Sequence, residues 1–508
     1  MYGFWNRLVE TGRKLPFSWL VYDTLVYGAA RYLNVVSAIL LTPIYTRLLT
    51  KDDYGIIEIF VTWNMFMSVV ITLGLPTALQ RFYWEVKDDP ERKRETIGTL
   101  HGLMLGAAAV YAIALLPFRH AFLNAFNAPA TPPEIFYESI ALVVLTSFFT
   151  FVQTLHQAAL RKYYFAAVSV LNFAIVTVLG FFLVYVWGQG VVGFFRASVV
   201  ALVVSCVAGL FTTTEVFALA LNRSLGRQLL SYSMPFIGVF FLFQSSNVLD
   251  RFLVTRFLSL EAAGVFSVAN KIAGLLSFAI SSFSLAWFPY AMQIKESSSA
   301  KRVYAEMFLY YVAVATLLVN AIAMFRTEII SVFAPAYSAA NHTIAVLCLC
   351  YIVAGSVYVL TLGLHITEQT RHMIWPGVTS VAVNVVASVA LVQVVGLEGI
   401  AYGSLLGSLV WVVLQVRKAQ RLYRIPFTYR FCLNCTFLTL IVVYGGPYLD
   451  AALLPVSTLV RMGTKVSLLS AVLAVAYLAY VAERRRGLLA PAVPIPISQE
   501  AARFARPR

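Results

Sequence analysis

The ten residues TRLLTKDDYG at positions 46–55 have a counterpart in TRFLSLEAAG at positions 255–264. At a constant offset of 209 positions, the identical residues are Thr46 and Thr255, Arg47 and Arg256, Leu49 and Leu258, and Gly55 and Gly264. An apolar composition inflates chance matches between leucines, but it does not inflate matches of a Thr-Arg pair or a loop glycine. The two stretches therefore predict that the chain is built from two related halves.

The sequence around these stretches is too apolar for a protein surrounded by water. Of the 508 residues, 60% are hydrophobic and only 12% are charged, whereas soluble domains carry about 45–50% apolar and about 25% charged residues. This composition excludes a soluble enzyme, a disordered chain and a secreted disulfide scaffold. Much of the surface must face lipid.

A helix needs about 20 apolar residues to cross a bilayer, and helices are expected because unpaired backbone groups are not tolerated in hydrocarbon. We find fourteen such windows, near residues 22–45, 56–80, 97–117, 135–159, 163–186, 191–219, 230–253, 262–288, 304–325, 340–364, 373–395, 398–416, 430–449 and 459–482. Only Gly396, Leu397 and Glu398 separate the eleventh and twelfth windows, so thirteen spans is the alternative count.

The repeat organises these spans. Its two copies lie six predicted spans apart, an even number, so both halves cross the membrane in the same direction, as in transporters with parallel repeats. We therefore predict an all-α polytopic membrane protein with two parallel six-helix lobes plus two C-terminal helices. The predicted boundaries are 1–220 for the N-lobe (spans 1–6), 221–425 for the C-lobe (spans 7–12), 426–485 for spans 13 and 14, and 486–508 for a cytoplasmic tail.

The net charge of +15, from 38 Lys and Arg against 23 Asp and Glu, predicts the orientation. Most of the basic residues fall in every second connection between spans, and the positive-inside rule assigns those connections to the cytoplasm. We expect a multi-pass protein of the inner (plasma) membrane with both termini in the cytoplasm. The excess of positive charge then needs no nucleic-acid partner.

Charged residues inside spans cost about 2.5–3.5 kcal/mol at the helix centre, so they indicate a pathway by default. Arg31 and Lys271 each lie about nine residues into a span, close to the midplane at about 1.5 Å per residue, and one falls in each half. Two such cations suit an anionic ligand. Polar residues share their helix faces, and the predicted cavity-lining, substrate-binding set is Arg31, Asn34, Asn247, Arg251, Asn270 and Lys271.

Other interpretations of these residues stay open. The polar side chains could only mediate helix packing, and Arg31 could pair with Glu58 as a structural element. Arg251 and Asp250 lie near the predicted outer interface, where a side chain can extend to water. Coupling to protons or sodium could use Glu58, Glu215 or Asp250. We expect no cofactor and no metal site, because the cysteines lie in spans, the histidines form no ligand motif, and no phosphate-binding GxxxxGK[ST] loop occurs.

Residues 27–83, with TPIYTRLLTKDDYGIIEIF and LGLPTALQRFY, resemble the N-terminal segment of polysaccharide flippases, and residues 233–273 resemble a second signature of that family. The family comprises O-antigen and exopolysaccharide (Wzx-type) flippases of the multidrug/oligosaccharidyl-lipid/polysaccharide (MOP) exporter superfamily. The resemblance implies a V-shaped cavity between two lobes, lined by spans 1, 2, 7 and 8, with a lateral opening for a polyprenyl tail. It also implies that cations in the cavity hold the diphosphate.

We therefore expect a transporter, not an enzyme. Its expected function is to flip a polyprenyl-diphosphate-linked oligosaccharide from the cytoplasmic to the outer leaflet by alternating access, for the biosynthesis of surface polysaccharide such as the O-antigen of lipopolysaccharide. Expected partners are this substrate, membrane lipid, and a glycan polymerase with its chain-length regulator. Alternatives are a lipid II flippase, a drug or ion antiporter of the same superfamily, or a membrane glycan polymerase or ligase. The last needs a catalytic loop, and the longest outer connection holds little beyond Arg119 and His120.

Overall fold

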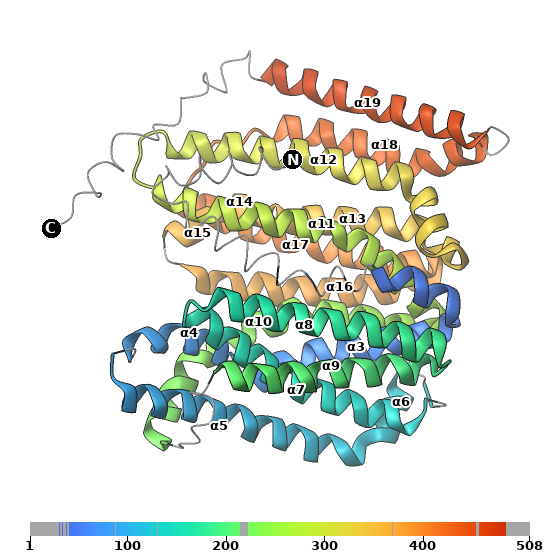
Figure 1. Ribbon diagram of the computed structural model, residues 1–508. Coiled ribbons are helices and arrows are strands. Elements are labelled where there is room, and N and C mark those ends of the chain that lie inside the picture. Colours follow the sequence, from blue (N-terminus) through green and yellow to red (C-terminus); the bar gives the residue numbers. More distant parts are fainter. Residues whose placement is uncertain are drawn as a thin grey trace, which may run out of the picture.

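The computed structural model describes residues 30, 33, 37, 40–86, 88–126, 128–129, 131–213, 222–367, 369–453 and 457–483. Every regular element in these ranges is a helix (Figure 1). The elements before residue 220 are α3 (Lys51–Thr72), α4 (Leu75–Glu85), α5 (Pro90–Leu115), η1 (Leu116–Phe118), α6 (Arg119–Ala125), α7 (Pro133–Ala158), α8 (Lys162–Phe181), η2 (Phe182–Val186) and α9 (Gly190–Thr212). The all-α prediction is confirmed.

The remaining elements continue the same architecture. They are α10 (Arg223–Phe257), α11 (Leu260–Gln293), α12 (Ala300–Phe333), η4 (Pro335–Ala340), α13 (Asn341–Gly355), α14 (Val357–Leu360), α15 (Leu362–Ile366), η5 (Thr370–Met373), α16 (Ile374–Val395), α17 (Leu397–Leu422), α18 (Tyr429–Leu453) and α19 (Thr458–Glu483). In Figure 1, α3–α9 lie together on one side of the molecule and α12, α18 and α19 on the other, with α10 and α16 between them.

Twelve segments of the described chain are long and apolar enough to cross a membrane. The first predicted span, 22–45, falls largely outside the described residues, and the seventh coincides with α10, a helix of 35 residues that is not among the twelve. The multi-pass membrane fold is thereby confirmed, while the count of fourteen stays a prediction. Spans 11 and 12 are separate helices, α16 and α17, which Gly396 joins with a φ of 61°.

The second predicted span is broken where the sequence suggests a continuous helix. Leu73 and Gly74 both have positive φ, and they divide α3 from α4. A Cβ on Gly74 would come within 2.7 Å of the carbonyl oxygen of Ser233, so α10 passes too close for a larger residue. Gly74 and Pro76, the second residue of α4, favour a break locally, and the close approach of α10 also requires glycine at position 74.

The repeated sequence folds into repeated local structure. Thr50 caps the N-terminus of α3 in a capping box with Asp53, and Ser259, its counterpart, caps the N-terminus of α11 by accepting from the backbone N–H of Ala262. Such caps provide acceptors for the free N–H groups of a first helical turn. The two helices begin 209 positions apart, at the offset of the repeat.

Helix α10 packs against both sets of elements. Near its start, Leu229 belongs to an apolar cluster with α4 and α5, including Leu79 and Leu100. Near its end, Val254 belongs to a larger cluster with α11 and α13. The predicted division at 220/221 therefore cuts the chain just before a helix that joins both sides, and the two-lobe organisation stays a prediction.

The C-terminal hairpin of α18 and α19 is fastened to α12 by buried charges. The ammonium group of Lys465, whose side chain is 1% exposed, lies 2.8 Å from a carboxylate oxygen of Glu328 and 2.5 Å from one of Asp450. Pro447 lies within α18 and has no N–H for the Val443 carbonyl, which instead accepts from Nη1 of Arg326 at 3.1 Å. The hairpin is thus tied to the bundle by specific polar contacts.

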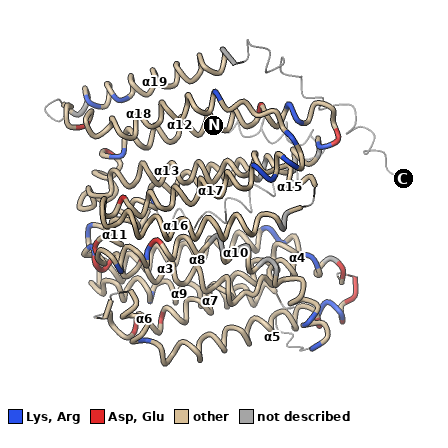
Figure 2. Tube along the Cα trace, turned by 180° about the vertical axis from the view of Figure 1, so that it is seen from behind, with Lys and Arg blue, Asp and Glu red and all other residues tan. Residues whose placement is uncertain are grey.

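Charge is unevenly distributed along the bundle. Figure 2 shows Lys and Arg gathered at the end where α4 finishes and α5 begins, and where α17 finishes. This is the asymmetry that the sequence predicts. The assignment of that end to the cytoplasm stays a prediction.

Candidate functional site

Three helices bring charged side chains together beside the crossing of α3 and α11. Glu58 of α3 forms ion pairs with Lys271 of α11 and with Arg251 of α10, whose Nη2 lies 3.5 Å from Oε2. The exposed fraction of the side chain is 2% for Glu58, 8% for Arg251 and 31% for Lys271. A single buried carboxylate thus binds two cations, of which only Lys271 remains substantially accessible.

Tyr54 completes the environment of Lys271. It lies one helical turn before Glu58 on α3, so both side chains point toward α11. The ammonium group of Lys271 donates to the Tyr54 hydroxyl at 2.8 Å and lies 4.9 Å from the centre of its ring. Tyr54 is fully buried and packs edge-on against Tyr337. Lys271 is therefore held on one side by two groups of α3.

Asp250 precedes Arg251 in α10 but points toward a different pair of helices. Its carboxylate accepts from Nδ2 of Asn384 in α16 at 2.9 Å and from the hydroxyl of Ser404 in α17 at 2.7 Å. Ser388 donates in turn to the amide oxygen of Asn384 at 3.0 Å. Asp250 is therefore held by neutral donors, whereas Glu58 is held by cations.

Two asparagines of the predicted site, Asn247 and Asn270, lie in the described part and have different surroundings. The side-chain oxygen of Asn270 accepts from the hydroxyl of Tyr351 at 3.1 Å. The backbone carbonyl of Asn247 accepts from Nη1 of Arg251 at 3.4 Å, one turn along α10. The structure thus brings Arg251, Lys271 and Glu58 into direct contact. Asn270 precedes Lys271 in the chain and contacts Tyr351.

Three of the predicted site residues, Arg31, Asn34 and Glu215, lie outside the described residues. The proposed pairing of Arg31 with Glu58 is accordingly untested. The interpretation of Arg251 and Asp250 as side chains that extend to water is wrong, because they are only 6% and 7% exposed and make buried polar contacts. The roles of the candidates in binding and coupling stay predictions.

Close packing lies next to this ion network. At the start of the two helices, Lys51 of α3 pairs with Glu261 of α11 at 2.7 Å. Between that pair and Glu58, Gly55 and Gly264 let the two backbones approach closely. Contacts therefore connect α3 and α11 from their first turn to Lys271.

The energetics of such a network depend on its completeness. Removing one partner of a buried ion pair costs about 3–5 kcal/mol, because the remaining charge keeps its desolvation penalty without compensation. Glu58 compensates two cations here, so any opening of the α3–α11 contact must offer Lys271 and Arg251 another anion or water. The arrangement can therefore exchange one anionic partner for another.

Sequence reasoning missed several polar partners. Tyr54 belongs to the repeat but was not predicted as a site residue, although it lies four residues before Glu58 and so on the same helix face. Asn384, Ser404 and Tyr351 lie in apolar spans, where a single amide or hydroxyl gives no distinguishing signal. In the described part of the chain, no cluster of His, Cys, Asp and Glu could hold a metal ion.

Comparisons with known proteins agree on the type of molecule. The family model described as polysaccharide biosynthesis protein matches residues 20–295, more than half of the chain. A search of curated proteins finds no match.

Among solved structures, the lipid II flippase MurJ in an inward closed conformation matches with a TM-score of 0.69 at 12% identity, over 92% of this chain and 99% of that one. An inward-facing multidrug resistance MATE family transporter of the MOP superfamily matches with a TM-score of 0.57 at 14% identity, over 77% of this chain and 94% of that one. A MATE in complex with MaD5 matches with a TM-score of 0.55 at 16% identity, over 81% and 97%. At these identities the likeness establishes the fold alone.

Proposed function

The chain belongs to the polysaccharide biosynthesis protein family and has the fold of MOP-superfamily transporters, and on this basis we propose that it flips a lipid-linked oligosaccharide across the plasma membrane. The proposed substrate is a polyprenyl diphosphate that carries the oligosaccharide. Movement runs from the cytoplasmic to the outer leaflet, and both termini lie in the cytoplasm. A glycan polymerase with its chain-length regulator then extends the delivered units.

The observation that carries the proposal is the shared partner of Lys271 and Arg251. These two cations from α11 and α10 meet one carboxylate, Glu58 of α3, where the two copies of the repeat touch. A diphosphate presents more negative oxygens than one carboxylate and forms strong charge-assisted hydrogen bonds with such groups. It can therefore replace Glu58 as the partner of these cations.

This replacement links binding to opening. In this structure, Glu58 holds α3 to α10 and α11. When a diphosphate reaches the accessible side of Lys271 and binds both cations, α3 loses these ion pairs and the α3–α11 contact can open. The sugar hydroxyls stay in a polar cavity, which avoids the cost of moving unpaired polar groups through hydrocarbon, while the polyprenyl chain stays in lipid.

The membrane potential supports the direction. A negative interior favours outward movement of an anion by about 2.3 kcal/mol per charge per 100 mV. Ion coupling, if present, would use a carboxylate of the site, and Asp250 is the better candidate because neutral donors hold it.

A second candidate function is the flipping of lipid II. Its support is the fold match to the lipid II flippase MurJ, which covers 92% of this chain. Lipid II is also a polyprenyl-diphosphate-linked sugar, but it carries a peptide. The same cation pair would serve either head group, so the two candidates differ in the part of the substrate beyond the diphosphate.

Transport into proteoliposomes tests the proposal. The probe is a polyprenyl diphosphate with one fluorescent sugar, added to the outer leaflet. A quenching reagent outside the liposomes reaches only this leaflet, so the fluorescence that escapes quenching measures how much probe has crossed. We expect the Lys271→Gln, Arg251→Gln double variant to lose at least about tenfold in rate. Lys465→Gln is the matched control, since Lys465 is also an ion-paired lysine but lies, more deeply buried, in the C-terminal hairpin.

Two results would overturn the proposal. The wild-type protein could fail to move the fluorescent lipid, or the double variant could move it at the control rate. Unlabelled lipid II and an unlabelled, peptide-free diphosphate-linked oligosaccharide are then each tested as inhibitors of the movement of the fluorescent lipid, which distinguishes the two candidates. Stronger inhibition by lipid II would favour the second.

A further inference from the structure

A pocket of about 360 Å³ lies on the outside of the bundle between α8 and α9, and no residue of the Glu58 network lines it. On α9, Phe195 is fully buried and packs against Phe60 of α3, whereas the neighbouring Arg196 and Val200 line the pocket. Trp187 at the rim is 65% exposed and Val200 is 43% exposed. The pocket therefore opens on the face that lipid must cover.

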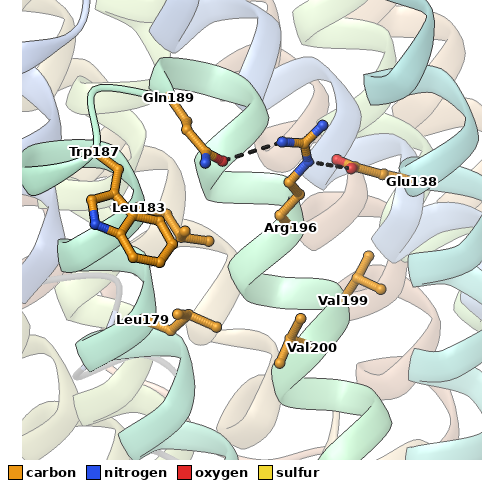
Figure 3. Close-up of a pocket in the computed structure, with 8 residues that line it drawn as sticks. All are labelled: Glu138, Leu179, Leu183, Trp187, Gln189, Arg196, Val199 and Val200. Carbon is orange, nitrogen blue, oxygen red and sulfur yellow. Dashed lines mark hydrogen bonds and ion pairs between the residues drawn. The ribbon is translucent and has the colours of Figure 1, made fainter.

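Polar groups occupy one end of this pocket (Figure 3). Nε of Arg196 lies 3.3 Å from Oε1 of Glu138 in α7, and Nη1 donates to the side-chain oxygen of Gln189 at 3.3 Å. A guanidinium group has five N–H donors, so further donors remain for an anion. The second carboxylate oxygen of Glu138 is buried and has no hydrogen-bond partner among the described residues. It lacks a donor.

Local backbone structure creates this polar end. The π-helical turn Phe182–Val186 ends α8, and Gly188 and Gly190 follow with φ of 62° and 56°. These left-handed residues turn the chain sharply, which glycine does at little cost, and they return Gln189 to Arg196. A π-helical turn is rare and often marks a functional site.

The rest of the pocket is apolar. Leu179 and Leu183 of α8 and its π-helical turn face Val199 and Val200 of α9 (Figure 3). Arg196 lies six residues after the start of α9, about 9 Å along the helix, and Trp187 lies at the rim. Arginine and tryptophan at this depth are typical of the level of lipid head groups.

We propose that this pocket binds a phospholipid whose head group carries a primary ammonium, such as phosphatidylethanolamine. The phosphate accepts from Arg196, the ammonium donates to the accessible part of the Glu138 carboxylate, whose side chain is 20% exposed, and one acyl chain lies between α8 and α9. Phosphatidylcholine has no N–H on its head group and so cannot donate to Glu138. Phosphatidylglycerol has no ammonium group, so its head group adds a negative charge beside Glu138 and no positive charge to offset it. Head-group charge thus selects the lipid, independently of the transported substrate.

Native mass spectrometry of the full-length protein tests this assignment. The delipidated protein is mixed with equal amounts of phosphatidylethanolamine, phosphatidylcholine and phosphatidylglycerol in detergent. We expect one phosphatidylethanolamine to be retained about tenfold over either other lipid. Arg196→Gln removes retention of all three, whereas Glu138→Gln keeps binding but loses the preference against phosphatidylglycerol.

Two further variants separate the site from general effects. Val200→Trp fills the apolar part while leaving the ion pair, and it should remove the bound lipid. Arg81→Gln is the matched control, because Arg81 and Glu85 form an exposed ion pair at 3.4 Å on α4. Equal retention of the three lipids would overturn the head-group assignment. Retention unchanged by Val200→Trp, in a variant that melts like the wild type, would overturn the site.

Discussion

Gly55 of α3 and Gly264 of α11 lie against each other across the helix crossing. A Cβ on Gly55 would come 3.4 Å from the backbone nitrogen of Gly264, and one on Gly264 would come 3.3 Å from the nitrogen of Gly55. Each added atom would also collide with a backbone carbonyl oxygen, that of Leu260 or of Lys51. Leu260 and Lys51 are themselves 209 positions apart. The contact therefore has two-fold symmetry.

Alanine at Gly264 should force α3 and α11 apart at this end. Overpacking of a close contact costs about 1–3 kcal/mol, and the colliding atom is backbone, which cannot rotate away. With cysteines in place of Lys51 and Glu261, whose side chains pair at 2.7 Å, we expect disulfide formation to fall several-fold. Gly463→Ala on α19 is the control, because no atom lies within 4 Å of its added Cβ. Unchanged disulfide yield would contradict the close contact.

Replacing Glu58 with Gln should destabilise the protein strongly. Lys271 and Arg251 would both lose their carboxylate, and loss of one partner from a buried ion pair costs about 3–5 kcal/mol. Adding Lys271→Gln should recover part of that loss, because one uncompensated charge is removed. Thermal unfolding of the wild type, both single variants and the double variant measures the coupling. Additive effects would show that Glu58 and Lys271 do not interact.

Asp250→Asn should separate ion coupling from structure. The two oxygens of Asp250 accept one hydrogen bond each, from Asn384 and from Ser404. Asparagine has one uncharged side-chain oxygen, so it accepts from only one of these donors, and that hydrogen bond is weaker. If Asp250 carries a proton during transport, the variant should still move the fluorescent lipid but no longer respond to an imposed pH gradient. Proteoliposomes with and without the gradient provide the measurement. The same acceleration in variant and wild type would exclude Asp250 as the coupling residue.

Lys465→Met should loosen the C-terminal hairpin without affecting the Glu58 network. The variant leaves Glu328 with Arg461 at 3.5 Å and Asp450 with the Thr327 hydroxyl at 2.6 Å, so we expect a loss in stability smaller than that of a fully buried pair, which is about 3–5 kcal/mol. Limited proteolysis should then cut first between α18 and α19 or between α17 and α18. The double variant Lys465→Met, Glu328→Met should restore resistance in part. Initial cleavage elsewhere would argue that the hairpin is not held by these charges.

The helical membrane class and most spans could be predicted because lipid allows few solutions for the backbone. The starts of α3 and α11 were predicted too late, at 56 and 262, because the caps Thr50 and Ser259 begin these helices at Lys51 and Leu260. Gly55 and Gly264, which we expected in a loop, therefore lie within helices. Gly74 and Pro76 favour a bend in the second span, but the approach of α10 to Gly74 could not be foreseen. That information lies in contacts between distant segments, which a single sequence does not display.

Three members of the Glu58 network stand out in the sequence, but their pairing does not, and their role in binding stays a prediction. Lys271, Arg251 and Glu58 stood out because charges in apolar spans are rare. Their partners did not, because sequence position gives depth in the membrane but not the rotation of one helix against another. Asn384 and Ser404 gave no signal at all, since their hydrogen bonds to Asp250 exist only in the folded chain.

The reciprocal glycine contact also bears on the origin of the chain. When each of two sites touches the other in the same way, the contact is of the isologous kind that symmetric homodimers form. A half-length ancestor could pair with a second copy of itself through this surface, and gene duplication with fusion would preserve the interface inside one polypeptide. Neither glycine could then drift alone, because any larger residue meets the backbone of the other copy. This mutual constraint accounts for the match of Gly55 with Gly264.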